Sequence, residues 1–122
     1  MKDSLAQAVK ELKKYKEIQG IYLFGSVAKG RNKPLSDIDL ALVTTPLSTT
    51  RKAEITLALP EKYDISLFLD LPISIRYKIL KEGKIIYNKN NLFLKRAQIS
   101  TFNQYLDFRP ILERRIKKVL RS

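Results

Sequence analysis

The feature that most constrains the fold is a pair of apolar runs, at residues 21–24 and 38–43, with a polar segment between them. Short apolar runs bounded by glycine or aspartate are typical of buried strands. The polar segment begins with Gly25 and Ser26, and Asp37 ends it one residue before the second run. We therefore predict two strands whose ends carry polar side chains, joined by a loop that contains Pro34.

Helical and strand patterns alternate along the rest of the chain. The predicted helices and turns are 3–18, 26–30, 46–59, 72–82 and the segment from Asn91 onward, and the predicted strands are 21–24, 38–43, 63–69 and 84–87. Gly20 and Gly83 are predicted to end helices. Pro110 is predicted to kink or break the last helix. This alternation predicts an α/β or α+β domain with one small sheet of about four strands, flanked by helices, and a C-terminal helix.

Composition limits the possible chemistry. A chain of 122 residues that is 44% apolar is expected to form one domain, residues 1–122, around a single core. It has neither cysteine nor histidine, which excludes disulfides, thiolate or imidazole zinc sites, and histidine general bases. The sequence contains no long apolar run for a membrane span and no apolar segment of a signal peptide, so a cytoplasmic location without membrane contact is expected.

The net charge of +12, from 24 basic against 12 acidic residues, allows two interpretations. A basic field attracts nucleic acid, nucleotides or an acidic protein. A lysine-rich chain without cysteine is also typical of proteins from hot environments. The charge alone does not choose between RNA contact and composition bias.

Gly25 and Ser26 form a candidate phosphate site. A strand that turns directly into a helix leaves free backbone N–H groups that bind phosphate oxygens. Gly25 permits the sharp turn, and the Ser26 hydroxyl adds a hydrogen-bond donor or a helix cap. The same two residues also fit an ordinary corner between a strand and a helix.

Asp37 and Asp39 form a candidate metal site. Residues i and i+2 of a strand point to the same face, so both carboxylates project together while Ile38 faces the core. Two close carboxylates repel each other unless a cation lies between them, and magnesium prefers such hard oxygen ligands. The alternative is simply a polar start to a strand.

Taken together, Gly25-Ser26, the ten residues 27–36, and Asp37-x-Asp39 resemble the signature of the nucleotidyltransferase superfamily, which has the DNA polymerase β-like fold with a small mixed sheet. The superfamily also uses a third carboxylate on a later strand. Asp64 matches that role, since it begins an apolar strand on the face opposite Ile65. Asp70 lies on the same face of this predicted strand as Asp64 but six residues further along it, too far from the other carboxylates. It is therefore predicted to cap the next helix.

The resemblance implies ATP as substrate and two magnesium ions held by Asp37, Asp39 and Asp64. Gly25 and Ser26 would orient the phosphates, while the acceptor hydroxyl attacks the α-phosphate. Without histidine, a carboxylate or a metal-bound oxygen must act as base. Three loop cations lie between the two halves of the signature, where they could contact phosphate or simply face solvent: Lys29, Arg31 and Lys33.

In its small size, the chain further resembles the minimal nucleotidyltransferases (MNT), which are antitoxins paired with HEPN ribonuclease toxins. That resemblance rests also on Ile85-Ile86-Tyr87 and on Tyr105-Leu106-Asp107-Phe108. It implies transfer of AMP to a tyrosine of the toxin.

The last helix offers aromatic candidates for contact with the HEPN partner, although it could equally cover the chain's own sheet: Phe93, Phe102, Tyr105 and Phe108. Its basic end, residues 114–121, could face an acidic partner, RNA or solvent. Two other functions stay open at this stage. One is nucleotidyl transfer to RNA or a small molecule, and the other is a non-catalytic antitoxin that binds ATP and acts by occlusion.

Overall fold

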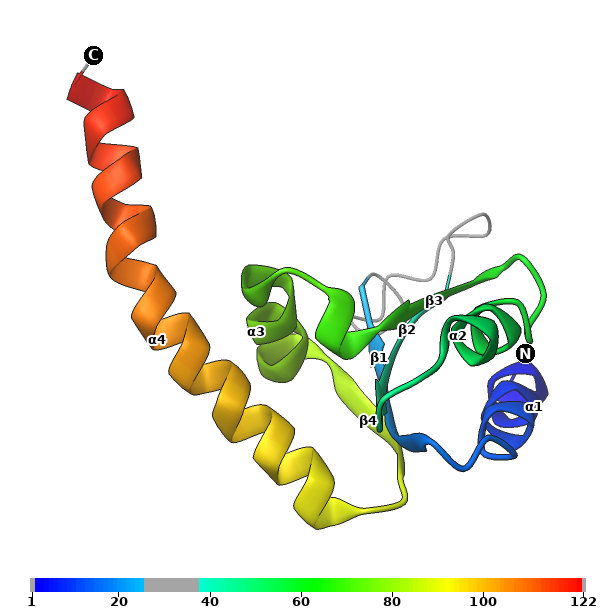
Figure 1. Ribbon diagram of the computed structural model, residues 1–122. Coiled ribbons are helices and arrows are strands. Elements are labelled where there is room, and N and C mark those ends of the chain that lie inside the picture. The colour runs from blue at the N-terminus through cyan, green and yellow to red at the C-terminus, as the bar shows by residue number, and fades with distance from the viewer. Residues whose placement is uncertain (1, 26–37, 122) are drawn as a thin grey trace.

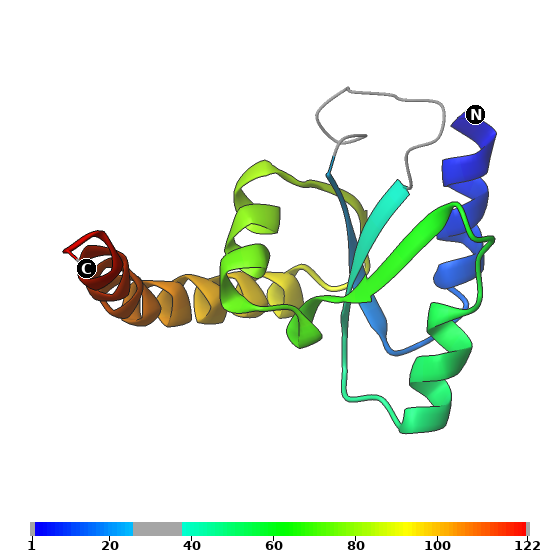
Figure 2. The ribbon, with the colours of Figure 1, turned by 90° about the horizontal axis from the view of Figure 1, so that it is seen from above.

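A four-stranded sheet lies between two pairs of helices (Figures 1 and 2). The structure, a computed structural model, describes residues 2–25 and 38–121. Along the chain, the elements are α1 (Lys2–Leu12), β1 (Ile18–Phe24), β2 (Ile38–Thr44), α2 (Thr49–Thr56), β3 (Tyr63–Leu67), a 3-10 turn (Phe68–Asp70), α3 (Ile73–Glu82), β4 (Lys84–Asn88) and α4 (Asn91–Arg121). Figure 2 shows α1 and α2 on one face of the sheet and α3 and α4 on the other.

The sheet is mixed, with the strand order β3-β2-β1-β4. β1 pairs antiparallel with both β2 and β4, whereas β2 and β3 run parallel. The two central strands are buried on both faces. This explains why the sequences of β1 and β2 are almost continuously apolar and do not alternate between apolar and polar residues. The predicted mixed sheet of four strands is therefore confirmed.

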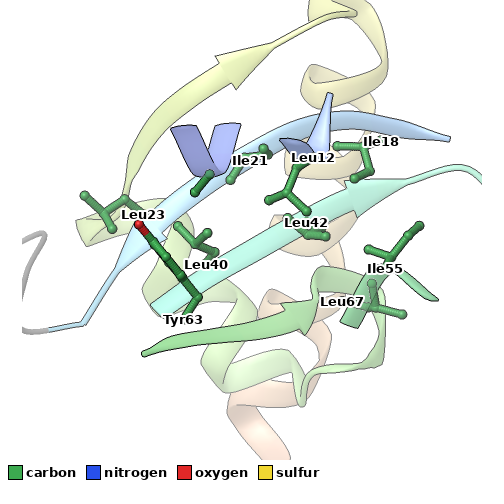
Figure 3. Close-up of a cluster of buried hydrophobic side chains, with 10 residues drawn as sticks. Leu12, Ile18, Ile21, Leu23, Leu40, Leu42, Ile55, Tyr63 and Leu67 are labelled. Carbon is green, nitrogen blue, oxygen red and sulfur yellow. The ribbon is translucent and has the colours of Figure 1, made fainter. Parts of the chain in front are cut away.

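One core lies between the sheet and the α1/α2 layer (Figure 3). Leu12 of α1 and Ile55 of α2 are fully buried there against side chains from three strands. The labelled members of this cluster are Leu12, Ile18, Ile21, Leu23, Leu40, Leu42, Ile55, Tyr63 and Leu67. Burying each such aliphatic side chain contributes about 1.5–3 kcal/mol, so this face holds β1, β2 and β3 in register.

A second core joins the opposite face of the sheet to α3 and α4. Its buried members are Tyr22, Ala41, Val43, Phe68, Ile79 and Leu94. Leu94 packs directly on Gly20 of β1, where a Cβ would overlap the leucine side chain. Gly20 is therefore a packing residue inside a strand, and the prediction that it ends a helix is wrong.

The first helix is shorter than predicted. It ends at Leu12 rather than near Ile18, and Ile18 instead begins β1, fully buried and paired with Thr44. The apolar residue at position 18 continues the helical spacing by coincidence, because its burial comes from the sheet. The predicted strand 21–24 lies within β1, which starts three residues earlier.

Two predictions for the segment after β3 are also wrong. The strand ends at Leu67, and Leu69 lies in the 3-10 turn with 57% of its surface exposed, so it does not share a buried face with Ile65. Asp70 does not cap α3, whose N-cap is Pro72 without a side-chain hydrogen bond. The Asp70 carboxylate instead accepts a hydrogen bond of 2.9 Å from Lys52 Nζ.

The other predicted elements hold with small changes of boundary. β2 and β4 match their predicted ranges, and Gly83 does end α3. α2 begins only at Thr49, because Ser48 is its N-cap and accepts a hydrogen bond from the backbone N–H of Arg51 at 3.1 Å. The turn predicted at 26–30 and the predicted loop that contains Pro34 lie outside the described residues.

The last helix is the longest element and continues through Pro110 to Arg121, so the proline does not break it. Figure 1 shows that the helix axis changes direction partway along its length. The first half of α4 covers α3 and the sheet: Phe93 packs on the second core, and both Phe102 and Tyr105 contact the ring of Tyr77. Among the described residues, no helix is both long and apolar enough to cross a membrane.

Candidate active site

Three strand ends meet at one edge of the sheet. β1 ends there and β2 begins beside it, with Phe24 and Asp39 as antiparallel register partners. β3 begins at the same edge because it runs parallel to β2, and Asp64 is the register partner of Asp39. Gly25 follows directly after β1. The sheet therefore places Gly25, Asp39 and Asp64 at the same edge.

Asp39 and Asp64 project from the same face of the sheet. Register partners on neighbouring strands point to one side, and Asp39 has the parity of Ala41 and Val43, which face the α3/α4 layer. Asp39 is half-buried and Asp64 is exposed. Neighbouring strands lie about 4.8 Å apart, so two carboxylates at this spacing repel each other. A cation bound between them would remove that repulsion.

Gly25 and the Asp39 carboxylate lie against each other. The backbone of Gly25 has a φ of 78°, in the left-handed region that favours glycine. A Cβ at position 25 would collide with the Oδ2 atom of Asp39 and would lie 3.3 Å from its Cγ. Only glycine therefore allows the turn after β1 and the carboxylate on β2 to occupy neighbouring space.

Backbone contacts fix the position of this edge. The backbone N–H of Ile38 donates to the carbonyl oxygen of Lys62 at 2.8 Å, which ties the start of β2 to the start of β3. On the other side, Gly83 lies under β1, since a Cβ there would be 3.2 Å from the carbonyl oxygen of Leu23. The sequence identified Gly83 only as a helix end, and its spacing gave no signal of this second role.

Two tyrosines near the site are kept in their protonated form. Burial raises the pKa of Tyr22, although the hydrogen bond that Gln98 Nε2 donates to its hydroxyl, at 2.8 Å, lowers it in part. Burial also raises the pKa of Tyr63, which precedes Asp64. Neither phenol is therefore suited to act as a base near neutral pH, and carboxylates are the bases that remain at this edge.

Several predicted site residues lie outside the described part of the chain. Ser26 and Asp37 are among them, as are the three loop cations Lys29, Arg31 and Lys33. Within residues 2–25 and 38–121, no group of three acidic side chains is placed to hold a metal ion. A metal held by Asp39 and Asp64 therefore needs further ligands, from a bound phosphate or from residues beyond the described ones.

The comparison with known families agrees with this arrangement of strands and carboxylates. The family model described as Polymerase beta, Nucleotidyltransferase matches residues 6–92, which include Gly25, Asp39 and Asp64. The chain belongs to this nucleotidyltransferase family. The family match covers all four strands and ends just inside α4.

A curated relative of this nucleotidyltransferase is a protein of Methanocaldococcus jannaschii with the provisional name protein adenylyltransferase. The two are 33% identical over 105 residues, which cover 84% of this chain and 78% of the relative.

Solved structures show the same fold at lower identity. A crystal structure described as the toxin-antitoxin with AMP-PNP matches with a TM-score of 0.74 at 20% identity, covering 97% of both chains. A structure of a tri-AMPylated Shewanella oneidensis HEPN toxin in complex with MNT antitoxin matches with a TM-score of 0.69 at 18% identity, covering 97% of this chain and 94% of the other. The predicted nucleotidyltransferase fold is confirmed, with its mixed sheet and C-terminal helix.

Proposed function

We propose that this nucleotidyltransferase is a magnesium-dependent protein adenylyltransferase that transfers AMP from ATP to a tyrosine of a HEPN ribonuclease toxin and thereby neutralises it. The observation that carries the proposal is the register pairing of Asp39 with Asp64, next to the left-handed Gly25. This arrangement supplies carboxylates for metal and base beside a backbone turn that can receive phosphate.

The residues at the edge fit magnesium and a triphosphate. Carboxylate oxygens are the ligands that magnesium prefers, and the missing side chain of Gly25 gives the Asp39 carboxylate the space that it occupies. Asp37, Asp39 and Asp64 would hold two ions, and Gly25 and Ser26 would orient the phosphates. Magnesium at this place would neutralise charge on the triphosphate and make the α-phosphate more electrophilic.

The reaction is an in-line displacement at the α-phosphorus. The acceptor tyrosine oxygen forms a bond to the α-phosphorus, and the bond from that phosphorus to the α–β bridging oxygen breaks, so that pyrophosphate leaves. Asp64 takes the proton of the acceptor hydroxyl, because it is exposed on the site face and the chain contains no histidine. Gly25 would orient the phosphates for the attack, and the half-buried Asp39 would hold the metal that binds them.

The assignment of an antitoxin and its partner is supported by relatives. The M. jannaschii relative carries the name of a protein adenylyltransferase, and the described Shewanella oneidensis complex contains a HEPN toxin that is tri-AMPylated. A third structure, described as the toxin-antitoxin MntA-HepT, matches with a TM-score of 0.74 at 19% identity, covering 98% of this chain and 99% of the other. These matches span the full architecture of the present chain, including α4.

A labelling assay tests the function directly. The purified protein is incubated with magnesium and ATP labelled at the α-phosphate, in a lysate of the source cells and with the purified HEPN-family protein of those cells. We expect one labelled protein band and AMP on tyrosine by mass spectrometry. Asp39→Asn should abolish the label, whereas Asp70→Asn, which removes an exposed carboxylate away from the site edge, should not.

Each other outcome selects a different function. Label on RNA or on a small molecule would show that the acceptor is not a protein. The net charge of +12 would favour RNA as such an acceptor. If Asp39→Asn bound the HEPN protein and inhibited its ribonuclease activity as fully as the wild type, neutralisation would occur by occlusion, and the proposed role of transfer would be wrong.

A further inference from the structure

The second half of α4 extends beyond the body of the protein. Both ribbon views show it projecting past α3, with no other described element beside it (Figures 1 and 2). The last aromatic contact with the body is Tyr105, whose ring stacks on Tyr77 at 3.8 Å between centroids. Every residue from 109 to 121 is exposed.

The helix face that covers the body continues along this extension. Leu94 is buried against the sheet, and Leu112 lies 18 residues later along the helix. Eighteen residues are five full turns at 3.6 residues per turn, so the two side chains point in the same direction from the helix axis. Leu112, Ile116 and Leu120 follow each other at intervals of four residues, with 36%, 50% and 80% of their surface exposed. The three form one apolar ridge, of the kind that packs into a groove of another helical protein.

Basic side chains flank this ridge. Residues 106–121 contain six basic and two acidic residues: Arg109, Arg114, Arg115, Lys117, Lys118 and Arg121, against Asp107 and Glu113. One acidic residue is already paired within the helix, since Arg109 Nε lies 3.1 Å from Glu113 Oε1. The remaining field is positive, so it complements a surface rimmed by carboxylates.

This combination of an apolar ridge and a basic rim distinguishes a protein partner from the alternatives. Single-stranded RNA is bound by stacking on several aromatic rings, whereas residues 106–121 contain one aromatic side chain, the half-buried Phe108. A second copy of the chain would place two basic surfaces against each other, which is unfavourable. An acidic helical protein satisfies both the ridge and the rim.

The stability of this extension also favours an occupied ridge. Most helical stability in proteins comes from tertiary packing of an amphipathic face, and every residue from 109 to 121 is exposed. Pro110 lacks the N–H that would bond to the carbonyl of Leu106, which weakens this segment further. Packing of the ridge into a partner would supply the stabilisation that the segment lacks on its own.

We infer that residues 106–121 form a docking helix that binds the acceptor protein through an apolar groove rimmed by acidic side chains, at a distance from the site that transfers AMP. The inference rests on the proposed function in one respect, namely that the acceptor is a protein. It assigns binding of the acceptor to Leu112, Ile116 and Leu120, and leaves the chemistry to the edge of the sheet.

The test uses Ile116→Glu, with Ile99→Glu as its matched control. Both isoleucines are exposed on α4, at 50% and 60%, and their side chains point in directions about 100° apart around the helix axis, because 17 residues correspond to about 4.7 turns. Glutamate is at least as good a helix former as isoleucine, so neither change should weaken the helix. Circular dichroism and the Tm confirm that both variants are folded.

Two measurements are made with the purified HEPN-family protein of the source cells: its Kd by calorimetry, and kcat and KM for its labelling. We expect Ile116→Glu to raise Kd and KM at least about tenfold, with kcat at saturating acceptor within about twofold of the wild type. Ile99→Glu should leave both unchanged. The triple change Arg114→Glu, Arg115→Glu and Lys117→Glu should weaken binding further, and added salt should reduce the difference.

Failure of the docking helix and failure of the proposed function give different results. If wild type labels the HEPN protein and Ile116→Glu labels it with unchanged KM, the docking helix is wrong while the function stands. If no labelling occurs but Ile116→Glu still loses binding, the docking helix stands without the chemistry. A wild-type dimer in solution that Ile116→Glu converts to monomer, or RNA binding lost with the basic residues alone, would overturn the acidic protein partner.

Discussion

The carboxylate of Asp39 lies against the backbone of Gly25, and this contact limits which side chains can occupy position 25. Gly25 takes a φ of 78° directly after β1, while Asp39 is the second residue of the neighbouring strand β2. A side chain at position 25 would occupy the space that this carboxylate uses. The pair therefore links the backbone turn to the position of a candidate metal ligand.

Gly25→Ala should slow AMP transfer at least about tenfold while the protein remains folded. The new Cβ would displace the Asp39 carboxylate, and the left-handed backbone would cost about 1–2 kcal/mol for a residue with a side chain. We expect at least a tenfold loss of labelling rate and a Tm lower by only a few degrees. Full activity in the alanine variant would show that the position of Asp39 does not depend on Gly25.

Asp64→Asn should lower the rate of AMP transfer by at least about 100-fold, because amide replaces both a metal ligand and the expected base. Asp70→Asn is the matched control, since Asp70 is an exposed aspartate in the 3-10 turn that follows β3 and bonds Lys52 instead. The rates are compared at saturating ATP and acceptor. If Asp64→Asn and Asp70→Asn lost equal amounts of activity, Asp64 would have no special role in the chemistry.

The candidate site was largely predictable because its signals are local. The apolar run 38–43 predicts β2, and the parity of Asp39 on that strand follows from the alternation of side chains. Asp64 could be placed in the same way, since it begins a strand whose other face is apolar. The direct pairing of Asp39 with Asp64 was beyond local reasoning, because register depends on how two whole strands pack.

The misassigned elements depend on contacts that are distant in sequence. Gly20 has the pattern of a helix end, yet its role is to admit Leu94 of α4 against β1. Ile18 has helical spacing but belongs to the sheet core. In both cases tertiary packing overrides the local preference. Pro110 differs from these two: it is predicted to kink or break the helix, and the helix continues through it to Arg121 although the residues after it are exposed.

The contact between Gly20 and Leu94 predicts a non-additive pair of substitutions. Leu94→Ala should lower the free energy of unfolding by about 2–5 kcal/mol, because it leaves a cavity between α4 and the sheet. Gly20→Ala should also destabilise, since its Cβ overlaps the leucine side chain. The double variant should be more stable than the sum of the two losses predicts, as the new methyl group fills part of the cavity.

Urea unfolding of the wild type, the two single variants and the double variant measures this coupling. The control pair is Leu57→Ala combined with Gly20→Ala, since Leu57 is 80% exposed and belongs to neither core cluster. That pair should be additive within about 0.5 kcal/mol. Strict additivity of Gly20→Ala with Leu94→Ala would contradict the direct contact between β1 and α4.

The ion pair between Glu17 and Arg51 should make part of the stability depend on pH. Arg51 Nε donates to Glu17 Oε2 at 3.0 Å, which joins the start of β1 to α2, and this hydrogen bond lowers the pKa of Glu17 from its ordinary value of 4.5. Because the folded-state pKa is below the unfolded one, the stabilisation is fully present above about pH 4.5 and is lost as the pH falls through the lowered pKa. Glu17→Gln should therefore be less stable than wild type at pH 7, and the difference should shrink under acid conditions. Urea midpoints of both proteins from pH 3 to pH 7 measure it, and a difference that stays constant with pH would mean that the charge of Glu17 contributes nothing to the fold.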